Sequence, residues 1–175
     1  QDKQGDKIEE VNKKCENNAK KHHETREQVE KSIFAEMRER DEKKHNFLVH
    51  GVPEVVDDSL QGYEKKEIDL TFIHDIAETI GVGLDNDKDI KFVRRLGEKK
   101  EDVNVIRPIL VGCYEVETKN IMLKNCKELS NHDEYAGVYL VTDLTQQQRK
   151  EEDQLYTDMH KNNSELTDEQ KSLNL

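Results

Sequence analysis

The sequence predicts an α+β protein that consists of a coiled-coil helix, a βαββαβ domain and a C-terminal helix. Residues 1–44 contain no proline, and their side chains repeat at the spacing of a helical heptad. At Asn46 this period changes to the alternation of a strand, and a new helical pattern begins at Thr145. We therefore expect a stalk over residues 1–44, a folded domain over 45–143 and a helical segment over 144–175, whose tail need not be ordered.

The stalk has the a and d positions of a coiled coil, although half of them are polar. Spacings of three and four residues alternate through Ile8, Val11, Cys15, Asn18, His22, Thr25, Val29 and Ser32. The apolar residues then shift to Ile33 and Met37, which is a stutter. We expect self-association, as a trimer rather than a dimer, through Ile8, Val11, Cys15, Asn18, His22 and Val29. The alternative is a single exposed helix whose periodicity arose by chance.

The domain is expected to alternate short strands with two helices. Strands are expected at residues 46–50, 90–94, 106–114 and 138–141, and helices at 68–80 and 119–126. Such an order forms a four-stranded antiparallel sheet with both helices on one face, the ferredoxin-like arrangement. Thr145 and Gln148 form the capping box of a last helix, which Leu155, Tyr156 and Met159 would anchor to the domain. The same signal recurs at residues 167–170, near the C-terminus.

Composition excludes several classes of protein. Charged residues make up 38% of the chain and hydrophobic residues 33%, so part of it should be solvated helix. No segment approaches the roughly 20 apolar residues of a membrane span, and the first residues are too charged for a signal peptide. We therefore expect an intracellular chain with no membrane partner.

No pattern in the sequence indicates catalysis or a cofactor. Cys15, Cys113 and Cys126 lack the C-x-x-C spacing of zinc sites and are odd in number, so we expect reduced thiols. The histidines lack the i, i+4 or cysteine partners of a metal site. Glycine-rich phosphate loops and nucleophile motifs are missing from the sequence. We expect no enzyme, no catalytic residue, no metal and no other cofactor.

Four segments, in this order and spacing, resemble the RRM core of the first-open-reading-frame proteins of LINE-type retrotransposons. They are residues 46–54 (NFLVHGVPE), 93–97 (VRRLG), 107–111 (RPILV) and 141–145 (VTDLT). The resemblance covers residues 44–155 and implies an RRM-like domain behind a trimeric coiled coil. It further implies a non-enzymatic nucleic-acid chaperone that coats its own transcript, single-stranded RNA, in a cytoplasmic ribonucleoprotein that can also be nuclear.

The resemblance also implies an RNA-binding set of basic residues. Arg95, Arg107 and Arg149 match basic positions of that family, and their sequence neighbours Arg94 and Lys150 join them, as do Lys43 and Lys44 at the end of the stalk. For Arg94, Arg95, Arg149 and Lys150, surface ion pairs are the alternative role. The chain departs from the family at Gly112, where a basic residue is common.

The charge distribution bears on the strength of RNA binding. The net charge is −11, and residues 46–115 hold 15 acidic and 9 basic residues. The positions where other RRM domains stack bases hold Leu48, Leu110 and Gly112, which leaves Tyr114 or Tyr139 as platforms. We expect salt-sensitive binding that depends on oligomerisation. The alternative function is a retrotransposon-derived assembly module that has lost RNA binding.

Overall fold

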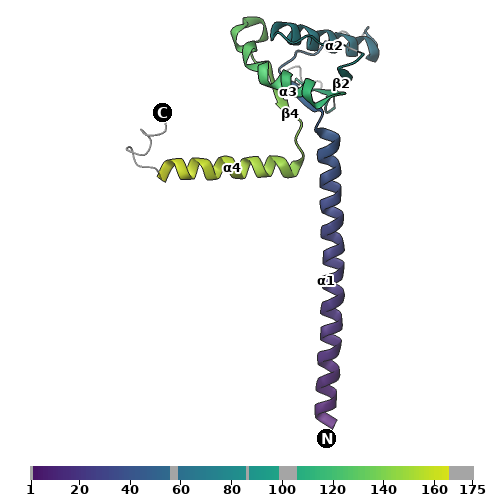
Figure 1. The fold of residues 1–175 in the computed structure, drawn as a ribbon. Helices are drawn as coiled ribbons and strands as arrows, with labels where there is room; N and C mark the ends of the chain where they lie inside the picture. Colours follow the sequence, from purple (N-terminus) through teal and green to yellow (C-terminus); the bar gives the residue numbers. More distant parts are fainter. Residues whose placement is uncertain (1, 56–58, 86, 99–105, 166–175) are drawn as a thin grey trace. The chain divides into compact units, whose positions relative to one another are not determined.

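The computed structural model describes residues 2–55, 59–85, 87–98 and 106–165, and side chains within them except those of 2–12, 16 and 165. The chain divides into two units, residues 1–40 and 41–175. Nearly all of the first unit belongs to one helix, α1 (Asp2–Lys43), whose 42 residues span about 63 Å (Figure 1). Pairs one turn apart, such as Arg26 and Glu30 at 2.9 Å, lie along its surface.

The second unit contains a four-stranded antiparallel sheet, several helices and the last helix, α4 (Gln146–Glu165). Its strands are β1 (Asn46–His50), β2 (Ile90–Arg95), β3 (Ile109–Cys113) and β4 (Tyr139–Thr142), in the order β2-β3-β1-β4. The connections contain α2 (Gly62–Thr79), α3 (Val116–Asn125) and two 3₁₀ helices, Cys126–Asn131 and Asp133–Tyr135 (Figure 1). The protein is therefore α+β, with a long N-terminal helix, an antiparallel sheet and a C-terminal helix.

One face of the sheet forms the hydrophobic core. Phe47 and Val49 of β1 pair with Val111 and Ile109 of β3, and all four side chains are fully buried. They belong to one cluster with Ile73, Ile76 and Ala77 of α2, Met122 of α3, and Leu129 and Tyr135 of the 3₁₀ helices. Because side chains alternate across a strand, this core covers one face of the sheet and leaves a second set of side chains on the other.

Element boundaries follow local chemistry. β3 begins at Ile109 and not at the expected residue 106, since Pro108 has no N–H to donate to the ladder. α2 begins before its apolar residues because Gln61 and Glu64 form a capping box. It ends at Thr79, and Gly81, which follows the C-cap residue Ile80, has a positive φ of 73° that favours a residue without a Cβ.

The last helix begins as expected but does not pack as expected. Gln148 Oε1 accepts from Thr145 N at 3.0 Å, and Gln148 N donates to Thr145 Oγ1 at 3.1 Å, so the capping box is confirmed. The expectation that Leu155, Tyr156 and Met159 anchor the helix is wrong, because all three side chains are exposed. The repeated signal at residues 167–170 lies outside the described residues.

Candidate nucleic-acid interface

The face of the sheet opposite the core, here called the outer face, carries a mixture of aromatic, basic and apolar side chains. Strand alternation and register assign to it Phe92 and Arg94 of β2, Leu110 and Gly112 of β3, Asn46, Leu48 and His50 of β1, and Tyr139 and Val141 of β4. Its centre is apolar and covered by neighbouring side chains, because Leu48 and Leu110 lie there and are only 7% and 3% exposed. The groups able to contact a ligand lie on the two edge strands.

A β-bulge separates Ile90 from Phe92 at the start of β2. Ile90 pairs with Cys113 and Phe92 with Gly112, so β2 has one extra residue, Lys91, between these pairs. Simple alternation would put Ile90 and Phe92 on the same side of the sheet. Phe92 lies on the outer face by alternation from the core residue Val93, and the bulge turns Ile90 into the core as well.

The ring of Phe92 lies where a side chain of β3 would otherwise project. A Cβ at Gly112 would meet Phe92 Cε1 at 2.3 Å and Cζ at 2.5 Å, well inside any real contact. Arg94 stands next to this ring, with Cζ 5.7 Å from its centroid, and its side chain is exposed. β2 therefore supplies an aromatic ring and a guanidinium where β3 has only backbone.

A second aromatic group lies on β4, at the opposite edge. The rings of His50 and Tyr139 stack with centroids 4.8 Å apart and planes 3° from parallel. Burial lowers the pKa of His50, which keeps its imidazole neutral at neutral pH. Tyr139 is 54% exposed and has a hydroxyl that can donate or accept a hydrogen bond.

Arg95, the neighbour of Arg94, points to the other side of the sheet and serves the fold. Its guanidinium binds the Asp69 carboxylate in two places, at 2.6 and 3.1 Å, and donates to the carbonyls of Val52, Pro53 and Arg107. The Arg95 and Asp69 side chains are only 9% and 12% exposed. These acceptors occupy all five N–H donors of the Arg95 guanidinium, so no donor is left to bind RNA.

Arg107 is engaged in the same way. Its Nε and Nη2 donate to the two Glu54 carboxylate oxygens at 3.0 and 2.8 Å, and Nη1 donates to the Gly97 carbonyl at 3.1 Å. These hydrogen bonds lower the pKa of Glu54 to about 2 and raise the pKa of Arg107. Arg95 and Arg107 thus lie together, where they fix the segment between β1 and α2.

The remaining basic candidates are spread over the second unit. Lys43 Nζ donates to the Leu144 carbonyl at 3.1 Å and lies 3.6 Å from Asp143, which ties it to the segment after β4. Lys44 pairs with Asp41 at 2.6 Å. Arg149 and Lys150 are exposed on α4. Of the seven predicted residues, only Arg94 lies on the outer face.

The candidate oligomerisation residues lie along α1. Cys15, Asn18, His22 and Val29 are exposed on the single helix, and the side chains of Ile8 and Val11 lie outside those described. Val29, Ile33 and Met37, each four residues apart on one face, are at least half exposed.

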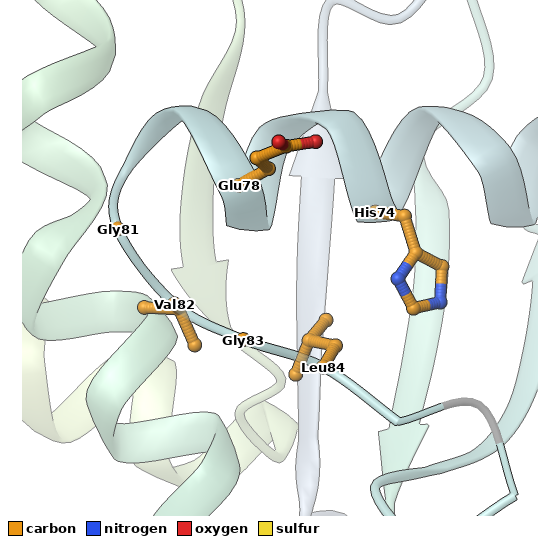
Figure 2. A pocket seen from close by; sticks show the side chains of 6 residues that line it. All are labelled: His74, Glu78, Gly81, Val82, Gly83 and Leu84. Atoms are coloured by element: carbon orange, nitrogen blue, oxygen red, sulfur yellow. The ribbon is translucent and has the colours of Figure 1, made fainter.

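A separate cavity lies away from the outer face. A cavity of about 410 Å³ at the end of α2 is lined by His74 and Glu78 on the helix, with Val82 and Leu84 from the loop that follows (Figure 2). In the described ranges, no three His, Cys, Asp or Glu side chains are grouped to hold a metal. Cys113 is buried, which raises the pKa of its thiol to about 11. None of the described helices is long and apolar enough to span a membrane.

In comparisons with known proteins, no family model matches the chain, and no curated protein matches it. Sequence reasoning missed Phe92 and the stacking of His50 on Tyr139. The one available signal was the spacing of Ile90 and Val93, two apolar residues three apart in a strand, which is typical of a bulge.

Proposed function

We propose that the chain is an RNA-binding protein that packages and chaperones the RNA of a LINE-type ribonucleoprotein. The observation that carries this proposal is the outer face, where Arg94 stands beside Phe92 at one edge and Tyr139 stacks on His50 at the other. Unpaired bases stack on aromatic rings, and guanidinium groups bind phosphates or stack on bases. Single-stranded RNA can use both kinds of group as it crosses the sheet.

The arrangement of the sheet supports an RRM-like domain. The element order β1-α2-β2-β3-α3-β4 and the strand order β2-β3-β1-β4 agree with a ferredoxin-like assignment. RRM domains of that fold bind RNA on the face away from their helices. Here Phe92 and Tyr139 lie on the edge strands, and the central strands contribute His50, Leu48, Leu110 and Gly112.

The stalk supports self-association as part of this function. A long helix with a half-exposed apolar face gains most of its stability when that face is buried against a partner. Val29, Ile33 and Met37 form such a face and continue the seam expected from Cys15 and His22. Three linked copies would present three outer faces to one RNA, so their weak contacts would act together.

The test is binding of the full chain to a fluorescent single-stranded RNA of about 30 nucleotides over a range of salt concentrations. We expect saturable binding whose log–log salt slope has a magnitude of about 0.7 for each phosphate that a basic side chain neutralises. Arg94→Ala should lower this slope and the affinity, and Phe92→Ala should weaken binding about tenfold or more because it removes a stacking surface. Lys66→Ala, an exposed lysine on α2, is the matched control and should bind as the wild type does.

A protein-assembly module without RNA binding is the second candidate. The net charge of −11 and the internal ion pairs of Arg95 and Arg107 favour it. Absence of binding even at low salt, from a protein that still self-associates, would refute the RNA proposal and support this alternative.

A further inference from the structure

A cavity of about 300 Å³ lies next to the outer face and shares Phe92 with it. It is formed where β1 and β2 begin and β3 ends, and its lining includes Asp41, His45, Asn46, Lys91 and Tyr114. Its volume is at the lower end of the range found for small-molecule sites, about 300–1,000 Å³. A segment of RNA on the outer face would therefore pass the mouth of a cavity large enough for a small planar group.

The lining suits one nucleobase better than a phosphate. Phe92 and Tyr114 offer aromatic surfaces for stacking, and Tyr114 is about half exposed. Lys91, the bulge residue, is exposed at the same cavity and can bind the phosphate attached to an inserted base. Asp41 and Glu42 add carboxylates, which would repel a phosphate, and the Asp41 carboxylate can accept hydrogen bonds from the edge of a base.

The acidic group also discriminates among bases. The hydrogen bond from Lys44 lowers the pKa of Asp41, so this side chain is a carboxylate at neutral pH. A carboxylate accepts two parallel hydrogen bonds from adjacent donors. Guanine presents its N1–H and N2–H groups side by side, whereas uracil flanks its single N–H with two carbonyls that a carboxylate repels.

We propose that this cavity binds a single unpaired guanine of the RNA that crosses the outer face, with Asp41 reading its Watson–Crick edge and Phe92 and Tyr114 stacking on its ring. The inference rests on the proposed RNA-binding function and assigns to it a base-selective subsite. Asp41 is exposed and pairs only locally with Lys44 in the contacts described, so its replacement should leave the fold intact.

The experiment compares the affinity of the full chain for an oligouridine with that for the same strand carrying one guanine. Wild type should bind the guanine strand about tenfold more tightly, as one bidentate base contact predicts. One inosine, which lacks the 2-amino group, should give an intermediate affinity. Asp41→Asn should lose most of the guanine preference and keep its affinity for oligouridine. Asp75→Asn removes the same charge from an exposed site on α2 and should keep the preference.

The possible failures are distinguishable. If wild type binds the two strands equally, the guanine subsite is refuted while RNA binding stands. A preference that Asp41→Asn retains would likewise overturn the assignment of this cavity. No binding to either strand at low salt would refute the proposed function and the subsite with it.

Discussion

Replacing Gly112 with alanine tests whether the ring of Phe92 occupies the space above β3. The new Cβ would lie 2.3–2.8 Å from three ring atoms, whereas carbon atoms pack at about 3.5–4.0 Å, so the ring must move by about 1 Å or more. Overpacking of this kind costs about 1–3 kcal/mol, and alanine gains about 0.5–1 kcal/mol over glycine in a strand. We therefore expect Gly112→Ala to be destabilising or nearly neutral in the wild-type background.

The effect of Gly112→Ala on the free energy of unfolding should reverse its sign once the ring of Phe92 is removed. In a Phe92→Ala background, Gly112→Ala keeps only the backbone gain and should stabilise the protein by about 0.5–1 kcal/mol. Urea unfolding of the wild type, the two single variants and the double variant is followed by circular dichroism. Provided that the four m-values are equal, the free energies of unfolding give the coupling energy between the two positions, which we expect to be about 1–3 kcal/mol. Additive effects, within about 0.5 kcal/mol, would show that Phe92 does not lie over Gly112 and would refute the geometry of the outer face.

Three further predictions concern the ion pairs and the stalk. Arg95→Met should destabilise the protein by about 3–5 kcal/mol in urea, because it leaves the Asp69 carboxylate buried without its partner, and adding Asp69→Leu should recover most of the loss. Because the pKa of Glu54 is about 2 in the folded protein and 4.5 ordinarily, its pairing with Arg107 stabilises above pH 4.5 and is lost as pH falls towards 2. We expect this loss of stability to be about 1 kcal/mol after solvent screening, and Glu54→Gln should abolish it. The measurement is the urea unfolding midpoint of both proteins as a function of pH. Val29→Asp should lower the molecular mass of the protein in sedimentation equilibrium, because it places a charge on the apolar face of α1. An unchanged mass would exclude this face of α1 from self-association.

Most element positions could be predicted from the sequence, since their signals are local. The change of period at Asn46 and the hydroxyl of Thr145 act within a few residues, and both mark real boundaries. The expected start of β3 at Ile106 is wrong, because Pro108 cannot donate to the sheet although Ile106 itself is β-prone. A fixed chemical constraint outweighs a propensity at such a boundary.

The candidate site was harder to predict because it depends on register and on distant pairing. Arg94 and Arg95 are neighbours in sequence but lie on opposite faces of the sheet, and only the structure shows which of them Asp69, 26 residues away, binds. The bulge at Lys91 turns Ile90 into the core, so alternation counted from Ile90 would place Phe92 on the wrong face of the sheet. The sequence indicated which residue types were available, while the tertiary pairing decided which were exposed.

The ion pairs of Arg95 and Arg107 bear on the proposed oligomerisation. Residues 46–115 hold nine basic residues against 15 acidic ones, and two of the nine, Arg95 and Arg107, are taken up inside the domain. Under the proposed function, one outer face with Arg94 has too few cations for more than non-specific affinity for RNA, on the order of 10⁻⁴–10⁻⁶ M. Linking copies through the stalk can raise the overall affinity by about 10²–10⁴ without a new contact, provided that one RNA reaches all faces. Under the proposed function, the exposed apolar side chains of α1 and the sparse cations of the outer face meet one requirement, because weak sites coat RNA when several of them act on the same strand.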